Sequence, residues 1–214
     1  GSKDQTAEEI KKAMGDCPNI HGVFYDNNGG KGKAIKKGVE AAKGKYIAFL
    51  DADLDLHPKQ LKRFMKPILP GDADVVIGSK MHKKSKINYP FVRKCISFGY
   101  YVMLKILFRL NTKDTQTGIK LFKSEVIKSI IPLIQTKGFA YDIEILAAVN
   151  RRGYRIKEMP IELNFTRKNG MGRIKFSDIL IVVKDTFSIF YRMYFKKYYD
   201  LESEKKYERQ VQKT

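Results

Sequence analysis

Residues 45–55 read KYIAFLDADLD, an apolar run that ends in three aspartates at alternate positions. The apolar run has the length and composition of a buried strand. Asp51, Asp53 and Asp55 follow it directly, and on an extended backbone their side chains would all point to one side. We therefore expect a buried strand with an acidic cluster at its carboxyl end.

The segments downstream of this strand predict an α/β fold. Residues 61–69, LKRFMKPIL, have the pattern of a helix, and residues 73–78, ADVVIG, form a second apolar run of strand length. A strand, a helix and a second strand in this order are typical of a parallel sheet. Ligands bind beyond the carboxyl ends of the strands in such sheets, and polar residues follow both runs. We expect the functional site at that edge.

The region upstream of the acidic stretch predicts two helices and a short strand. The first helix covers residues 6–14, where Thr6 and Glu9 have the spacing of a capping box. Residues 23–25 have the composition of a short strand. A glycine-rich turn, NNGGKG, then leads into a helix over about residues 33–42.

The composition indicates a folded globular protein, because 43% of the residues are hydrophobic and 12% are aromatic. A length of 214 residues suits one domain with a buried core. The 42 Lys and Arg outnumber the 23 Asp and Glu, for a formal charge of +19, which favours an anionic partner such as nucleic acid, acidic lipid or a phosphorylated substrate. Cys17 and Cys95 lie far apart, which argues against a disulfide framework or a cysteine metal site and suits a reducing compartment.

Two segments combine apolar and basic residues over helical lengths, residues 89–110 and residues 176–199. Neither contains an uninterrupted apolar stretch of about 18 residues, so we expect no membrane-spanning helix. Apolar helices with basic edges can lie in a membrane interface. They can equally be core helices whose Lys and Arg stems reach out to solvent. Composition alone leaves both interpretations open.

The acidic cluster favours a metal site. Three carboxylates on one side of a strand repel each other unless a cation lies among them. Mg²⁺ and Mn²⁺ prefer such oxygen ligands and often bridge to the phosphates of a substrate. A solvated acidic loop is the alternative interpretation. Because the cluster directly follows a buried strand in a basic protein, we favour Mg²⁺ or Mn²⁺ as a cofactor.

The stretch FLDADLD, with GGKGKAIKKG upstream, resembles the family 2 glycosyltransferases with the GT-A fold. Residues 113–122, KDTQTGIKLF, are very close to the DTQCGFKLF signature of dolichyl-phosphate glucosyltransferases and similar to the D-x-x-S-G-F-R of dolichyl-phosphate mannose synthases. Residues 138–146, GFAYDIEIL, match the family's F-x-F-D-x-E-L-L. Residues 158–162, EMPIE, and residues 170–173, GMGR, resemble E-I-P-V and part of R-x-x-G-x-S-K. These motifs occur in the family's order.

The resemblance implies a fold and an activity. The expected fold is α/β, with the mostly parallel sheet and flanking helices of the GT-A class and a C-terminal amphipathic helix on a membrane surface. The expected reaction is metal-dependent, inverting transfer of a hexose from a nucleotide sugar to a polyprenyl phosphate. UDP-glucose is favoured as the donor, and GDP-mannose is the alternative. The partners would be the nucleotide sugar, the polyprenyl phosphate and the cytosolic face of a membrane, where the protein would be peripheral.

The resemblance also assigns roles to individual residues. A carboxylate pair at a helix start can instead interact with the helix dipole, and a lone cation is often only a surface charge. Asp114 is expected to order its loop. The assigned roles are sugar or acceptor positioning for Asp142, Glu144 and Gln116; donor binding for Asp51, Gly30, Lys31 and Lys80; acceptor phosphate binding for Arg93, Lys120, Arg167 and Arg173; and metal binding for Asp53 and Asp55.

The chain departs from the family's pattern at two places. It begins GSKDQT, so the family's first strand and paired aspartates are not in it, and Gly172 stands where the family has serine. We expect an incomplete nucleotide pocket, a sheet that lacks one or two strands, and weak or no activity from this chain alone. The expected division is a catalytic domain over residues 1–175, an interfacial helix over residues 176–200 and a charged tail over residues 201–214.

Two functions from other classes compete with sugar transfer. A nucleic-acid-binding module would explain the net charge and the Tyr and Phe interleaved with Lys and Arg, although no RRM, KH or helix-turn-helix pattern is present. A non-catalytic partner at a membrane surface would explain the two apolar and basic segments. It would show no metal-dependent nucleotide binding.

Overall fold

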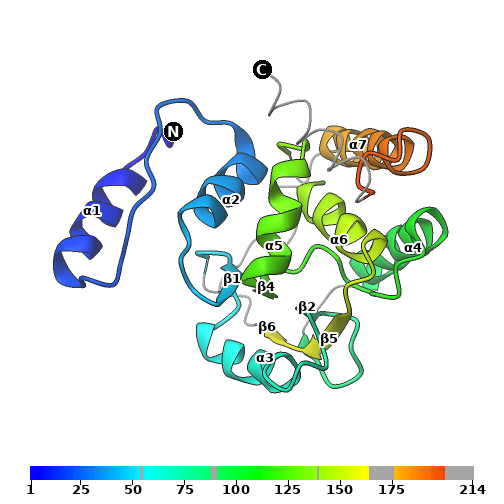
Figure 1. Cartoon of the computed structure of the whole chain (residues 1–214), viewed down its shortest axis with the longest axis horizontal. Coiled ribbons are helices and arrows are strands. Elements are labelled where there is room, and N and C mark those ends of the chain that lie inside the picture. The colour runs from blue at the N-terminus through cyan, green and yellow to red at the C-terminus, as the bar shows by residue number, and fades with distance from the viewer. Residues whose placement is uncertain (54, 88–90, 139, 164–175, 201–214) are drawn as a thin grey trace.

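The computed structural model describes residues 1–53, 55–87, 91–138, 140–163 and 176–200, without the side chains of residues 87, 91–97 and 176–179. Helices surround a small central sheet in this part of the chain (Figure 1). The elements in chain order are α1 (Thr6–Asp16), α2 (Gly30–Ala41), β1 (Tyr46–Leu50), a 3₁₀ turn (Pro58–Gln60), α3 (Leu61–Ile68), β2 (Val75–Ser79), β3 (Lys86–Ile87), α4 (Phe91–Phe108), β4 (Ile119–Lys123), α5 (Ser124–Ile130), a second 3₁₀ turn (Ile131–Leu133), α6 (Tyr141–Arg151), β5 (Ile156–Pro160), β6 (Glu162–Leu163) and α7 (Phe176–Tyr194).

The central sheet has the strand order β1-β4-β2-β5. Strands β1, β2 and β5 run in one direction, while β4 is inserted antiparallel between β1 and β2. The predicted α/β class is therefore confirmed, but the first two strands are not neighbours. Lys120, near the start of β4, lies opposite Phe49 of β1 and Ile77 of β2, so it occupies the middle of the sheet. Within the described residues β1 pairs only with β4, and its other edge is open.

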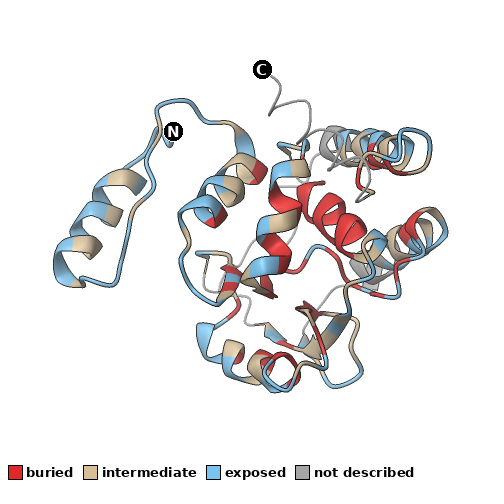
Figure 2. Ribbon diagram, in the orientation of Figure 1, coloured by how far each residue is buried: buried red, intermediate tan, exposed pale blue. Residues whose placement is uncertain are grey.

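Apolar side chains cover both faces of the sheet. On one face Val75 and Ile77 pack with residues of α4, α5, α6 and α7, and on the other Val76 packs with residues of α3. This alternation along β2 is the period-two pattern of a strand buried on both sides. Helix α6 is the most deeply enclosed, since residues 141–149 are all buried (Figure 2). Any carboxylate on α6 is therefore taken out of water and needs a partner.

The N-terminal segment packs less closely than the rest. Helix α1 has no buried residue and stands apart from the sheet and its helices (Figures 1 and 2). The predicted strand over residues 23–25 is wrong: these residues form no strand, and Val23 and Phe24 are each 45% exposed. A strand needs a neighbour to satisfy its backbone, and none of the described strands pairs with this segment.

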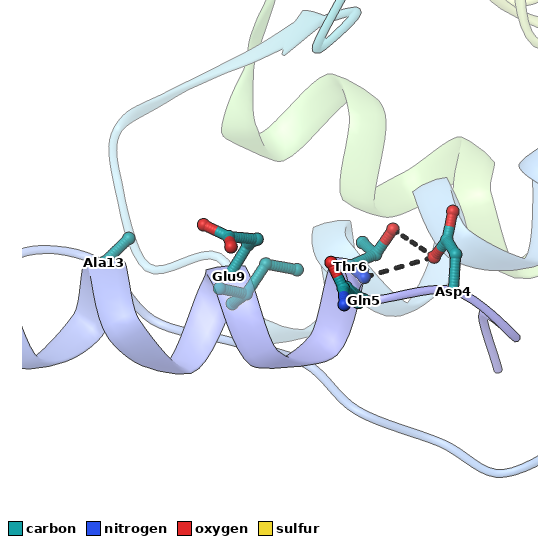
Figure 3. Close-up of a pocket in the computed structure, with 6 residues that line it drawn as sticks. Asp4, Gln5, Thr6, Glu9 and Ala13 are labelled. Atoms are coloured by element: carbon teal, nitrogen blue, oxygen red, sulfur yellow. Dashed lines mark hydrogen bonds between the residues drawn. The ribbon is translucent and has the colours of Figure 1, made fainter.

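The helix starts in this segment also differ from the predictions. Thr6 is the first residue of α1, so Gln5 and not Thr6 occupies the N-cap position, and no side chain forms the predicted capping box. The N–H and the hydroxyl of Thr6 both donate to Asp4 Oδ1. Helix α2 begins at Gly30, three residues before the expected Lys33. A pocket on α1 is lined by Asp4, Gln5, Thr6, Glu9, Ile10 and Ala13 (Figure 3). This pocket is therefore not at the edge of the sheet where the family motifs lie.

The two apolar and basic segments form α4 and α7, which pack on each other. Tyr100 Oη lies 3.1 Å from Thr186 Oγ1, and the rings of Phe108 and Phe190 are 6.3 Å apart between centroids. Burial raises the pKa of Tyr100 to about 12, so its hydroxyl stays protonated. Within the described part of the chain, no helix combines the length and apolar character needed to cross a membrane.

Candidate active site

The acidic segment does not continue β1. The strand ends at Leu50, and the described residues that follow form turns and bends, so the expected row of three aspartates along an extended backbone is wrong. The cause is local: Asp53 Oδ1 accepts the N–H of Asp55 at 3.3 Å, a hydrogen bond two residues on that favours a turn. The described residues contain no cluster of three Asp, Glu, His or Cys that could hold a metal ion.

Asp51 is held between two motifs that are distant in sequence. Its backbone N–H donates to the carbonyl oxygen of Gly118 at 3.1 Å, and its Oδ1 lies 2.5 Å from Lys31 Nζ. A side chain at Gly118 would collide with the Asp51 carboxylate, so the close approach requires glycine here. The side chains of Lys31 and Asp51 are 37% and 36% exposed, which leaves this ion pair open to a ligand.

Two glycines allow the start of α2 to lie against the loop before α6. Gly30 has a φ of +82°, and the N–H of Gly32 donates to Lys137 O at 3.0 Å. A Cβ atom would lie 2.5 Å from Lys137 O at Gly30 and 2.5 Å from Thr136 O at Gly32. The glycine-rich motif thus serves close backbone packing that points Lys31 toward the acidic segment.

Asp114 orders the loop that precedes β4, as the resemblance implied. Its buried carboxylate accepts the N–H of Lys80 at 2.8 Å, the hydroxyl of Thr117 at 2.5 Å and the N–H of Gln116 at 3.2 Å. Glu158 Oε1 in turn accepts the N–H of Asp114 at 3.1 Å, a support that sequence reasoning did not assign although Glu158 opens a family motif. Gln116 itself is exposed, next to this ordered loop.

Lys120 and Asp142 form a buried ion pair under the site. Lys120 Nζ lies 2.6 Å from Asp142 Oδ1 and donates to Thr117 O at 2.6 Å, and its side chain is 2% exposed. The assignment of Lys120 to the acceptor phosphate does not fit this position, because β4 places its ammonium among buried groups. Lys120 instead neutralises Asp142, which the start of α6 buries.

Tyr141 joins the two charged pairs. Its ring lies under Lys31 Nζ, 5.9 Å from the centroid. Burial raises the pKa of Tyr141 far above its usual value, and the neighbouring carboxylates Asp142 and Asp51 raise it further. Its hydroxyl therefore stays protonated. The only sequence signal for Tyr141 was that it stands where the family's motif has phenylalanine.

Glu144 lies in a different network, away from the Lys31–Asp51 pair. It is fully buried, and each of its carboxylate oxygens accepts two hydrogen bonds from neighbouring groups. One of these donors is Arg192 of α7, at 2.8 Å. No oxygen of Glu144 faces solvent, so the structure does not place this residue, assigned to sugar or acceptor positioning, in the exposed part of the site.

Three of the predicted cations, Arg93, Arg167 and Arg173, lie outside the described side chains. Arg93 belongs to α4, but its side chain is not among those described, and Arg167, Arg173 and Gly172 fall in residues 164–175. Lys80 Nζ lies 3.8 Å from Asp114 Oδ2, within reach of the ordered loop. The structure thus brings Lys31, Asp51 and the loop before β4 together at the end of β1.

Comparisons with known proteins agree with the motifs. Residues 1–131 match the family described as Glycosyl transferase family 2. A dolichyl-phosphate beta-glucosyltransferase of Dictyostelium discoideum is 31% identical over 200 residues, which are 90% of this chain and 61% of that protein. The dolichyl-phosphate beta-glucosyltransferase of Saccharomyces cerevisiae is 30% identical over 152 residues, 65% of this chain and 46% of that protein. The chain therefore spans less than two thirds of the length of these relatives.

A solved structure shares the fold. Glucosyl-3-phosphoglycerate synthase from Mycobacterium tuberculosis, in complex with Mn²⁺, UDP-glucose and phosphoglyceric acid, superposes with a TM-score of 0.60 at 16% identity, over 89% of this chain and 65% of that chain. This likeness confirms the GT-A-like fold. The match over residues 1–131, more than half of the chain, confirms the resemblance drawn from the motifs: the chain belongs to glycosyl transferase family 2.

Proposed function

We propose that this chain carries the sugar-transfer site of an enzyme that moves glucose from UDP-glucose to a polyprenyl phosphate of the dolichyl type. The relatives named dolichyl-phosphate beta-glucosyltransferase support the reaction. The observation that carries the proposal is the contact of Lys31, Asp51 and Gly118 at the end of β1. This contact brings together the glycine-rich, acidic and TQTG motifs at an ion pair whose side chains are partly exposed.

The proposed chemistry needs positioning more than proton transfer. An oxygen of the acceptor phosphate forms a bond to the anomeric carbon, the bond from that carbon to the diphosphate breaks, and UDP leaves with the bonding electrons. Attack from the face opposite the leaving group inverts the configuration. Since the acceptor phosphate is already an anion, the protein's main task is to orient two anionic substrates and to offset their charge.

The charged residues of the site suit this task. Lys31 presents a half-exposed ammonium beside Asp51, where it can bind a phosphate of the donor. Lys120 neutralises the second carboxylate, Asp142, so that this group does not repel the donor. Tyr141 stays protonated and can donate a hydrogen bond near both carboxylates. These residues hold and orient the donor in the proposed reaction.

The acidic segment fits a divalent cation completed by the substrate. Mg²⁺ is commonly bound through about one or two carboxylates plus substrate phosphates and waters, so a full protein cluster is not required. Asp53 and Asp55, both partly exposed next to Asp51, are the residues that would hold Mg²⁺ or Mn²⁺. When bound, the cation would neutralise charge on the leaving diphosphate.

We further propose that α4 and α7 lie on the cytosolic face of a membrane, where a lipid-linked acceptor is found. Each helix exposes large apolar side chains. On α4 these are Phe98, Val102 and Ile106, one helical turn apart, and on α7 and just after it Leu180, Ile181, Phe187, Tyr191 and Phe195. Lys105 and Lys184 are exposed on the same helices. An apolar face with flanking cations suits an anionic lipid surface.

Calorimetric titration of UDP-glucose, UDP and GDP-mannose, with Mn²⁺ and with EDTA, tests the donor and the metal. We expect UDP-glucose and UDP to bind only with Mn²⁺, more tightly than GDP-mannose, and Asp53→Ala to abolish the binding. Tighter binding of GDP-mannose would overturn the choice of donor. Binding that is unchanged by EDTA and by Asp53→Ala would overturn the metal site.

A further inference from the structure

A buried polar network connects the end of α7 to the loop before α6. Glu144 Oε1 accepts hydrogen bonds from Arg192 Nη2 at 2.8 Å and from the hydroxyl of Tyr199. Glu144 Oε2 accepts the backbone N–H of Gln135 at 3.2 Å and of Thr136 at 2.7 Å. A single carboxylate with no exposed surface thus joins α6, α7 and residues 135–136.

The same loop supports the start of α2. Lys137 O accepts the N–H of Gly32, and the carbonyl oxygens of Thr136 and Lys137 lie only 2.5 Å from where Cβ atoms at Gly32 and Gly30 would be. Lys31 lies between these two glycines and reaches Asp51 at 2.5 Å. A shift of the loop would therefore move the backbone that carries Lys31, because no side chains intervene to absorb it.

The hydrogen bonds of the network specify one relative placement of α6, α7 and residues 135–136. Apolar side chains could join α7 to α6 without burying a charge. Glu144 instead directs one oxygen at two backbone N–H groups of the loop, and a carboxylate that accepts two such bonds fixes their direction. Burial lowers the pKa of Arg192, but its hydrogen bond to Tyr199 and the charge of Glu144 together outweigh burial and raise this pKa, so Arg192 stays charged.

We propose that Glu144 and Arg192 are positioning residues of the donor site. They hold residues 135–137 against the start of α2 and so keep Lys31 beside Asp51. This inference rests on the proposed function, in which Lys31 binds the donor diphosphate. It also makes the geometry of the donor site depend on the seating of α7, the helix that carries one of the exposed apolar faces.

The chain offers a matched control for the test. Arg151, the last residue of α6, forms two hydrogen bonds with Asp200, at 2.7 Å and 3.0 Å. That pair also ties α6 to the segment after α7, but among the described residues neither Arg151 nor Asp200 forms a hydrogen bond or ion pair with residues 135–137. Glu144→Gln and Arg192→Gln are therefore compared with Asp200→Asn, with thermal unfolding recorded for all three.

The first readout is hydrogen exchange at the Gly32 amide, which donates to Lys137 O in the loop. This measurement requires no ligand. We expect Glu144→Gln to speed this exchange about ten-fold, the scale for losing a hydrogen bond to a charged group, and Asp200→Asn to leave it unchanged. Equal exchange of Gly32 in wild type and in both Glu144→Gln and Arg192→Gln would overturn the proposal. This measurement tests the positioning role even if the chain binds no nucleotide sugar. A failure to bind nucleotide sugar would count against the proposed function and not against the positioning role.

The second readout is a double-mutant cycle with Lys31→Ala, measured as the affinity for UDP-glucose with Mn²⁺. If Glu144 acts through Lys31, Glu144→Gln should weaken binding about ten-fold in wild type and hardly at all when Lys31 is already alanine. The same loss in both backgrounds would show a role in stability alone and would contradict the proposal. Asp200→Asn should leave the affinity as it is.

Discussion

Asp142 and Glu144 stand two positions apart in one motif of α6, yet their carboxylates serve different parts of the fold. Asp142 pairs with Lys120 beneath the site, while Glu144 binds α7 and a backbone loop. The motif identified both as important. It could not separate the roles, because the partners that define them lie far away in the sequence, Arg192 being 48 residues from Glu144.

Lys120→Met tests the buried ion pair. Removing the cation leaves the Asp142 carboxylate uncompensated in the protein interior, so unfolding should require about 3–5 kcal/mol less free energy. Adding Asp142→Asn should recover part of this loss, since no buried charge then remains unpaired. Urea unfolding followed by circular dichroism measures both variants. A Lys120→Met variant as stable as wild type would contradict the account of this pair.

Gly118→Ala tests the close approach at the end of β1. The added methyl group would collide with the Asp51 carboxylate and push it away from Lys31, so metal-dependent UDP-glucose binding should fall at least about ten-fold. Gly38→Ala is the control, because Gly38 lies in α2 with open space around it and alanine there should stabilise the helix by about 1 kcal/mol. Calorimetry checks both; unchanged affinity in Gly118→Ala would show that the contact does not matter for the donor.

The elements predicted best were those with a strong local pattern. Strands β1 and β2 and helix α3 begin or end within about two residues of the predicted bounds, because their apolar runs and turn residues are local signals. The insertion of β4 between β1 and β2 was not predicted, since pairing is decided by contacts between distant segments. The wrong prediction of a strand over residues 23–25 has the same cause. This apolar run has no partner among the described strands, which the sequence could not show.

Asp74 shows how three strands are tied at the edge opposite the site. Its carboxylate accepts from Arg155 Nε at 3.1 Å and from Lys123 Nζ at 2.7 Å. Asp74 directly precedes β2, Arg155 directly precedes β5 and Lys123 is the last residue of β4, so these bonds join the ends of the three strands. The Arg155 hydrogen bonds hold the pKa of Asp74 well below its usual value, against the effect of burial, and Lys123 adds to this. Because the folded pKa is lower than the unfolded one, the stabilisation is complete above about pH 4 and is lost as the pH falls below it.

Asp74→Asn should therefore lower the stability near neutral pH and flatten its decline in acid. Asp72→Asn is the control, since Asp72 is an exposed neighbour. Thermal unfolding between about pH 2 and pH 7 measures the difference between the two variants. Parallel pH profiles for wild type and Asp74→Asn would contradict the role of this carboxylate.

The whole molecule combines a formal charge of +19 with two helices that expose apolar side chains. Net charge alone left nucleic acid, acidic lipid and phosphorylated substrates open as partners. In the proposed function, substrates that carry phosphates would account for part of this charge. The exposed faces of α4 and α7 became visible only in the fold, because composition could not say which apolar residues of these segments enter the core.

Ile106→Ser tests the proposed membrane face. Ile106 is 74% exposed on α4, so the substitution should leave the fold intact and weaken binding to phosphatidylserine vesicles about ten-fold, from the loss of about 1.5 kcal/mol of apolar burial in lipid. Ile20→Ser, at a position 40% exposed near α1, should have no effect. Vesicle co-sedimentation at low and high salt measures both, and salt should weaken the wild-type binding. An equal response of the two variants would argue against a membrane contact through α4.

The measurement that tests the central claim most directly is transfer of radiolabelled glucose from UDP-glucose to dolichyl phosphate in vesicles with Mn²⁺, followed by extraction into organic solvent. We predict a glucosylated lipid from the protein and none from Asp53→Ala or Lys31→Ala. Binding of UDP-glucose without any labelled lipid, while GDP-mannose or a water-soluble acceptor supports transfer, would contradict the proposed reaction.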